Sequence, residues 1–204
     1  MSIQIRLDKD TITPELQRLL REAKHPKSIM GAGAKSVQKG IVKHLVDLQG
    51  RGNVHGWPSK HFFSGGPDSV RKHVGVASLT DTTAVITIAD ARFVHRIEGG
   101  TITAKRAKML AIPLTAEAYA ASGKGTLRQS MPGLVIVKTP KGAYLAMPTA
   151  GRGKGKDSLR FLFKLVPAVT TKPHPGDMPD AQKLGETARV DMMRAAEILF
   201  KAGR

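Results

Sequence analysis

The chain has 204 residues and a formal net charge of +17, from 33 Lys and Arg against 16 Asp and Glu. It contains no cysteine, which excludes disulfides and thiolate metal sites. No stretch approaches the roughly 18 apolar residues that a membrane span needs, and we expect no secretory signal peptide because the first residues lack an apolar core.

Positive charge is concentrated in one part of the chain. Residues 101–172 carry 13 Lys or Arg and only two acids, Glu117 and Asp157, and so hold +11 of the +17. Such a distribution is typical either of a solvated basic surface or of a surface that faces nucleic acid. Aromatic residues make up only 4% of the chain and are not clustered, which disfavours base stacking. Any nucleic acid is therefore expected to be contacted through its phosphates, without readout of sequence.

Helices are predicted for most of the first fifty residues. Alternation of apolar and polar residues first predicts a strand over residues 2–8. A helix then begins at Thr13 and Pro14 and ends before Pro26. A longer helix, capped by Ser28, runs to Gly50. Its apolar stripe consists of Met30, Ala34, Val37, Ile41, Leu45 and Leu48, and its basic edge of Lys35, Lys39 and Lys43.

A loop, a hairpin and a short helix are predicted next. Seven Gly and Pro residues make 50–70 a long loop, which carries the only tryptophan, Trp57. Apolar residues within 74–79 and 85–88 flank a turn at 80–82 and predict a hairpin. Asp90 can cap a helix that continues to Glu98 and ends at the Gly99–Gly100 pair.

The last hundred residues are predicted to be mainly strands, followed by one helix. Strands are expected at 109–114, 134–137, 143–147 and 159–166, with one or two helical turns at 115–121. Residues 150–156 form a Gly/Lys/Arg-rich loop. Four prolines predict that 167–179 is an extended connector, and Pro179–Asp180 opens the final helix.

This order of elements indicates an α+β fold, with N-terminal helices packed on an antiparallel sheet of hairpins and a C-terminal helix after a Pro-rich connector. We predict an α+β core domain over 1–166, including the long loop 50–70. Residues 167–204 then form the connector and the C-terminal helix.

No pattern of residues predicts catalysis, a metal or a cofactor. The segment 151–158 departs from a phosphate-binding loop, because Asp157 follows the lysine where Ser or Thr is needed. It is either a basic loop that follows a phosphate backbone or a solvated one. The seven histidines show no ligand-pair spacing, and His95 is expected to pack or to form a hydrogen bond. No nucleophile elbow or acid–base pair is present, so we do not expect an enzyme.

Trp57 has two interpretations. It either tucks its loop back onto the core or anchors a neighbouring subunit, since tryptophan is a frequent interface hot spot. Met178 and the Met192–Met193 pair are interpreted as core and interface filler rather than as a cofactor site.

The segment Phe93–Leu114 contains a histidine, a Gly-Gly pair, a Lys-containing basic turn and an apolar strand that runs to a proline. In this order it resembles the virion-morphogenesis (tail-completion, Mu G-like) proteins of tailed bacteriophages. Leu159–Pro167 followed by Lys172–Pro175 is similar to the family's next landmark, a strand leading into a proline-marked connector. The Trp57–Pro58 loop after the long helix also matches in position.

The resemblance implies an α+β structural virion protein near the head–tail junction, assembled in the host cytoplasm, with no enzymatic activity. Expected partners are copies of itself, arranged as a ring, and tail-tube, tail-terminator or head–tail connector proteins. A ring around a DNA conduit needs self-complementary faces and tolerance of phosphate. We therefore assign assembly contacts to Trp57, Pro58, Pro173 and Pro175, and a DNA-facing rim to Lys105, Arg106, Lys108, Arg152, Lys154 and Lys156.

The alternative is a free, sequence-nonspecific nucleic-acid-binding protein. It predicts tight and steeply salt-dependent DNA binding by the isolated chain, whereas a virion component is expected to bind DNA weakly alone and its protein partners strongly.

Overall fold

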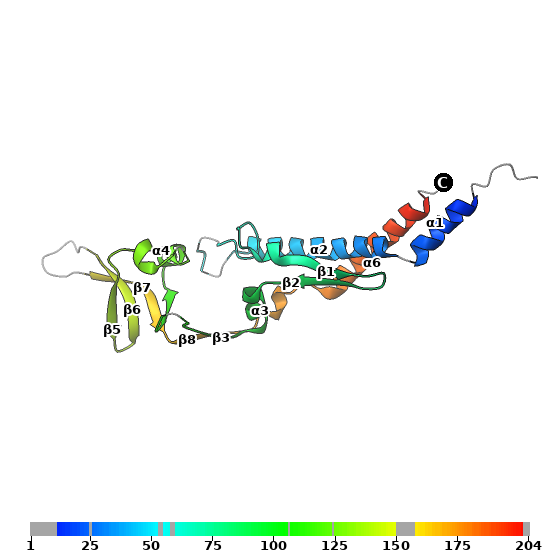
Figure 1. The fold of residues 1–204 in the computed structure, drawn as a ribbon. Helices are drawn as coiled ribbons and strands as arrows, with labels where there is room; N and C mark the ends of the chain where they lie inside the picture. The colour runs from blue at the N-terminus through cyan, green and yellow to red at the C-terminus, as the bar shows by residue number, and fades with distance from the viewer. Residues whose placement is uncertain are drawn as a thin grey trace, which may run out of the picture. The chain divides into compact units, whose positions relative to one another are not determined.

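The computed structural model describes residues 12–24, 26–52, 55–57, 60–105, 107–123, 125–149 and 158–201. The fold is α+β, as predicted, with N-terminal helices, antiparallel hairpin strands and a C-terminal helix after a connector (Figure 1). The strand predicted over 2–8 and the basic loop predicted over 150–156 lie outside the described residues.

The chain forms two compact units that alternate along the sequence. The first unit comprises residues 1–50, 61–90 and 178–204, and the second comprises 51–60 and 91–177. This division does not coincide with the predicted segments 1–166 and 167–204, because the C-terminal helix belongs to the same unit as the N-terminal helices.

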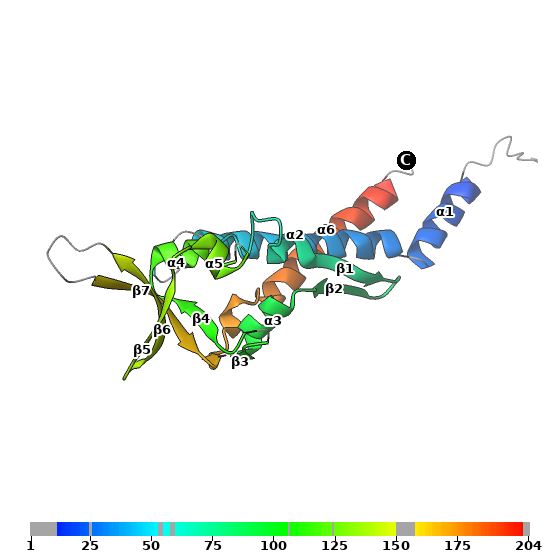
Figure 2. The same ribbon diagram turned by 60° about the vertical axis from the view of Figure 1, so that its left-hand side comes forward.

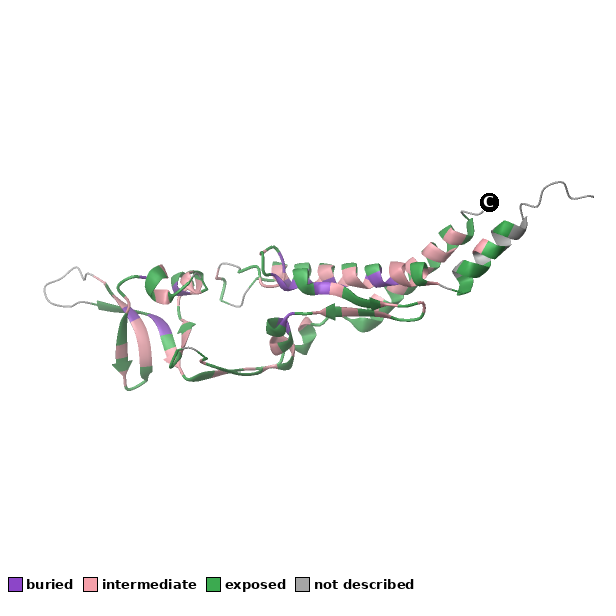
Figure 3. Ribbon diagram, in the orientation of Figure 1, coloured by how far each residue is buried: buried purple, intermediate pink, exposed green. Residues whose placement is uncertain are grey.

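The first unit is built around the long helix α2 (Lys27–Gly50). Helix α2 packs against α6 (Ala181–Lys201) and against the antiparallel hairpin of β1 (Val74–Leu79) and β2 (Ala84–Ile88). Helix α1 (Ile12–Lys24) and the short helix η1 (Val70–His73) complete the unit. The predicted stripe of α2 is confirmed, since Ala34, Ile41, Leu45 and Leu48 are buried (Figure 3).

Glycines let α2 and α6 approach closely. A Cβ atom on Gly33 would lie 2.7 Å from Sδ of Met192, and one on Gly40 would overlap with the side chain of Leu184. On another side of α2, a Cβ on Gly31 would lie 3.6 Å from Leu79 in the hairpin.

The start of α2 corrects the prediction that Ser28 caps this helix. The backbone N–H of Met30 donates to the carbonyl of Pro26 at 2.9 Å, so the first helical hydrogen bond ends at Pro26 rather than at Ser28. Ser28 lies inside the first turn and is exposed. Pro26 fits the cap position because the residue there supplies a carbonyl and needs no N–H of its own.

The start of α6 confirms the prediction that Pro179–Asp180 opens the final helix, and a substitution can test the cap. Asp180 Oδ1 accepts hydrogen bonds from the backbone N–H groups of Gln182 at 2.9 Å and Lys183 at 3.3 Å. Asp180→Ala is expected to destabilise the first unit by about 1 kcal/mol because these donors lose their partner. Thermal unfolding followed by circular dichroism checks this, and Asp180→Asn, which keeps a capping oxygen, should lose only a small part of that stability.

The second unit contains a four-stranded antiparallel sheet in the order β4-β7-β6-β5 (Figure 2). The strands are β4 (Leu110–Pro113), β5 (Val135–Thr139), β6 (Gly142–Thr149) and β7 (Ser158–Val166). They match the predicted strands, including the hairpin with its turn at 139–142. A two-stranded ladder is also present, formed by β3 (Gly100–Thr103) and β8 (Ala168–Thr171).

Two short helices contribute to the core of the second unit. Thr115 caps α4 (Ala116–Ala121) by accepting a hydrogen bond from Ala118 N–H. Helix α5 (Leu127–Ser130), which was not predicted, has a capping box between Thr126 and Gln129. The buried core consists of Ala118, Met131, Leu162 and Phe163.

A β-bulge explains why two consecutive residues of β7 are buried. Leu145 of β6 pairs with Phe163, whereas the next residue, Ala146, pairs with Phe161, so Leu162 is the extra residue. The bulge breaks the alternation of faces, and both Leu162 and Phe163 enter the core.

Candidate nucleic-acid and assembly surface

The basic turn of the sequence connects β3 to β4, between the β3–β8 ladder and the β4–β7 ladder. Thr103 pairs with Ala168 in the β3–β8 ladder, and Leu110 pairs with Val166 in the β4–β7 ladder. Six residues, 104–109, therefore stand opposite the single residue Pro167. Proline lacks the N–H that a ladder needs, so the break occurs where pairing is already interrupted. We call residues 104–109 the basic excursion.

The basic excursion presents its described cations to solvent. Lys105 and Lys108 are exposed, and neither forms an ion pair within the part of the chain that the structure describes. Met109 is 41% exposed beside them. The turn thus brings together two of the six predicted DNA-facing residues; Arg106, Arg152, Lys154 and Lys156 lie outside the described residues.

The ribbon on one side of the basic excursion is itself open to solvent. All four residues of β3 are exposed, and β3 pairs only with β8 among the described strands. The hydroxyls of Thr101 and Thr170 lie 2.9 Å apart across the ladder. Backbone pairing and such cross-strand contacts hold this arm, rather than a hydrophobic core.

A hydrogen-bonded junction fixes the arm to α3 (Ala91–Glu98). Nε2 of His95 lies 2.9 Å from Oγ1 of Thr171, and that hydroxyl also donates to the carbonyl of Gly100 at 3.2 Å. The prediction that His95 forms a hydrogen bond is confirmed. Gly99 has φ of 72°, and a Cβ there would lie 2.8 Å from the backbone of Pro173, so only glycine fits between helix and connector.

The connector returns to α3 through a second pair of contacts. Arg96 forms an ion pair with Asp177 of the short helix η2 (Pro175–Asp177) at 2.5 Å, and the N–H of His174 donates to the carbonyl of Arg96 at 3.0 Å. The predicted connector over 167–179 includes a strand that was not predicted. Its first residues form strand β8, because β-branched Val169, Thr170 and Thr171 lie between the prolines.

The predicted assembly residues differ in their surroundings. Trp57 is half-buried, with its ring 4.7 Å from the ring of His55 and 5.2 Å from that of Tyr119 in α4. The interpretation that Trp57 tucks its loop back is therefore confirmed within the second unit. Pro173 and Pro175 are exposed, and Pro58 lies outside the described residues.

Lys60 reinforces the attachment of the Trp57 loop. Its Nζ lies 4.5 Å from the ring centroid of Tyr119 and donates to Oγ of Ser122 at 2.7 Å. Lys60 and Tyr119 were not predicted as partners, since 59 positions separate them and neither belongs to a recognisable motif.

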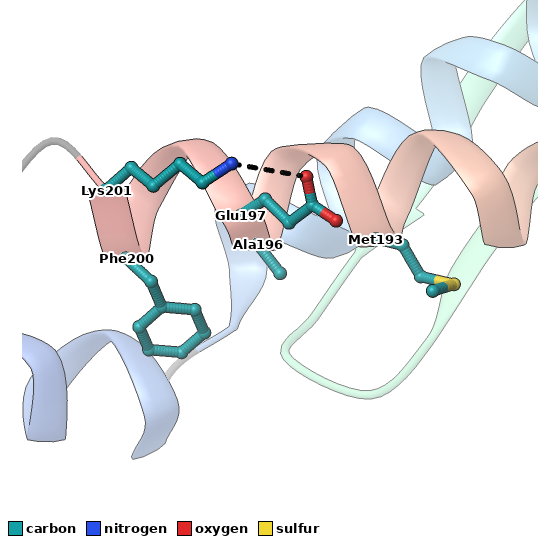
Figure 4. A pocket seen from close by; sticks show the side chains of 5 residues that line it. All are labelled: Met193, Ala196, Glu197, Phe200 and Lys201. Atoms are coloured by element: carbon teal, nitrogen blue, oxygen red, sulfur yellow. Dashed lines mark ion pairs between the residues drawn. The ribbon is translucent and has the colours of Figure 1, made fainter.

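A shallow apolar groove lies along α6 in the first unit. One part, with a volume of about 440 Å³, is lined by Met193, Ala196, Glu197, Phe200 and Lys201 (Figure 4). Glu197 and Lys201 form an exposed ion pair at 4.0 Å, drawn as a dashed line in Figure 4. The lining is mainly apolar and holds no constellation of catalytic groups.

Within the described ranges, no three His, Asp or Glu side chains gather as a metal site. None of the helices that the structure describes has both the length and the apolar character required to cross a bilayer. Comparison with protein-family models, with curated proteins and with solved structures found no match to this chain.

Proposed function

We propose that this chain is a structural virion protein of a tailed bacteriophage, a tail-completion or neck component at the head–tail junction. It assembles as a ring and joins or closes the tail around the DNA conduit, without enzymatic activity. The proposal starts from the resemblance of Phe93–Leu114 to the virion-morphogenesis proteins. In this chain that segment forms α3, the Gly99–Gly100 junction, β3, the basic excursion and β4.

The observation that carries the proposal is the basic excursion on its exposed ribbon. A ribbon with no core of its own contributes little to the stability of the unit, yet it is held to α3 by His95, Thr171, Arg96 and Asp177. Such an arm suits contact with a neighbour. Lys105 and Lys108 at its bend suit phosphate groups, which attract lysine independently of base sequence.

Partners are proposed on the same grounds. Among the described strands β3 and β8 pair only with each other, so the outer edge of each can accept an added strand. Exposed Pro173 and Pro175 lie directly after β8. We assign these positions to contacts with further copies in the ring, or with tail-tube, tail-terminator or connector proteins. Pro58 and Trp57 keep the same assignment, because the contact with Tyr119 leaves the Trp57 side chain only half-buried.

The second candidate, a free nucleic-acid-binding protein, is favoured by the net charge of +17 alone. A charge of this size attracts any polyanion. The two candidates differ at physiological salt, where the free binder holds duplex DNA tightly and the virion component binds it weakly without its protein partners.

Imaging of phage particles made without this protein tests the proposal. Heads and tails are expected to accumulate unjoined, or tails to lack a finished end, and infectivity should fall by orders of magnitude. Supplying the chain in trans should restore joined particles. Normal assembly and infectivity without it would overturn the proposal, as would turnover of a substrate by the purified protein.

The same complementation assay tests whether the lysines of the basic excursion are needed for infectivity. The variant K105E/K108E is expected to enter particles but to restore infectivity poorly. The control K138E/K141E changes the same charge at exposed lysines of the β5–β6 hairpin and should complement as the unmodified chain does.

A further inference from the structure

Helix α2 carries a second group of cations that the proposed function does not use. Lys35, Lys39 and Lys43 are all exposed and follow one another at intervals of four residues. Residues four apart on an α-helix are neighbours on its surface, so the three lysines form one ridge about 12 Å long. We call these three residues the lysine ridge.

The other sides of α2 are occupied. Gly33 and Gly40 face α6, whereas Gly31 faces the β1–β2 hairpin and Gln38 donates to the carbonyl of Val74 in β1 at 3.0 Å. At 100° per residue, the lysine ridge falls on the remaining side of the helix. Packing within the first unit therefore leaves the ridge to solvent.

The charge of α2 is not balanced within the helix. It contains four lysines and one acid, Asp47, and the lysine ridge forms no ion pair within the described residues. Like charges four residues apart destabilise an isolated helix. Helix α6 of the same unit differs, because its four basic residues accompany three acids and include the Arg194–Asp191 and Lys201–Glu197 pairs.

We propose that the lysine ridge binds the phosphate backbone of double-stranded DNA, so that the first unit has a DNA-binding surface separate from the basic excursion. Duplex DNA carries one negative charge per about 1.7 Å of axis, so a ridge of about 12 Å faces several phosphates. The ridge has no aromatic residue for stacking and no arginine for bidentate base contacts, and it therefore does not read sequence. The choice of DNA as the polyanion rests on the proposed function.

Binding of the full-length chain to a labelled duplex of arbitrary sequence tests this assignment. Fluorescence anisotropy is measured between about 50 and 200 mM salt, where phosphate contacts change affinity most visibly. The variant K35E/K39E/K43E is expected to bind at least tenfold more weakly at low salt. Its plot of log affinity against log salt should be shallower by about 2 to 3, since each lost phosphate contact removes about 0.9 from the slope.

A charge-matched control separates the ridge from net charge. The variant K183E/R189E/R194E reverses three exposed cations of α6 in the same unit and is expected to keep most of the slope. Equal losses in the two variants would overturn the proposal, as would displacement of the DNA by poly-glutamate or anionic vesicles at equal charge. Circular dichroism verifies that both variants are folded. The assay needs no phage particle, so failure of the ridge is distinguishable from failure of the proposed function.

Discussion

Replacing Phe163 with alanine is expected to destabilise the second unit by about 3 to 5 kcal/mol, because a buried aromatic side chain leaves both lost burial and a cavity. Phe163 is fully buried and is the largest member of a buried core that it forms with Ala118, Met131 and Leu162. Only four buried residues form this core among the described residues, and the hydrophobic residues that pack against it are partly buried. We expect a large part of the sheet's stability to be lost.

The single tryptophan provides the measurement. Trp57 belongs to the second unit and lies against Tyr119 of α4, the helix that contributes Ala118 to the core. Its fluorescence in a urea titration therefore follows unfolding of this unit. The midpoint should shift strongly to lower urea in Phe163→Ala.

A neighbouring phenylalanine is the matched control. Phe161 is 39% exposed, and its main aromatic partner is Tyr144 at 5.1 Å between ring centroids. Phe161→Ala on the same strand should cost about 1 to 2 kcal/mol, from partial burial and the ring pair. Equal shifts of the midpoint in the two variants would contradict the burial of Phe163 in the core and the bulge that places it there.

Elements with a clear period were predictable from the sequence. The stripe of α2 and the strand pattern of β5 and β6 appear where periodicity places them, because packing on one face selects the residues of that face. Asp180 was predictable as a cap because the hydrogen bonds at a helix start are local. Ser28 was misplaced, since Pro26 and Ser28 both suit that position and only the fold decides between them.

Pairings between distant segments were not predictable. The β3–β8 ladder joins Gly100–Thr103 to a strand almost seventy residues away, and the prolines that flank β8 favoured a connector without regular structure. The bulge at Leu162 depends on the register of β6, which no local pattern encodes.

Some features of the candidate surface were also predictable from the sequence, and others were not. Charge in 101–172 and the Gly99–Gly100 pair pointed to the basic excursion, because both are visible as composition and turn chemistry. The registers of two ladders place six residues opposite Pro167, and these registers could not be foreseen from the sequence. The contacts of Arg96 with Asp177 also depend on the return of the connector to α3.

Replacing Gly33 with leucine is expected to destabilise the first unit by about 1 to 2 kcal/mol, although leucine is the better helix former. A Cβ atom alone would lie 2.7 Å from Sδ and 2.8 Å from Cγ of Met192, and 3.8 Å from the backbone oxygen of Ala188. Met192 can move to admit one carbon, but a leucine has three more, which must push α6 away. Overpacking of this kind typically costs about 1 to 3 kcal/mol, more than the roughly 0.8 kcal/mol that helix propensity returns.

Gly185 of α6 provides the control with the opposite sign. It lies in the interior of a helix and is exposed, and a Cβ there would meet no atom within 4 Å. Gly185→Leu should therefore stabilise the unit by about 0.8 kcal/mol from propensity alone. Thermal unfolding followed by far-ultraviolet circular dichroism reports on both variants, because α2 and α6, with 24 and 21 residues, supply most of the helix. If Gly33→Leu also stabilised the protein, α2 and α6 would not be in the close contact that their glycines allow, and the packing that leaves the lysine ridge exposed would have to be reconsidered.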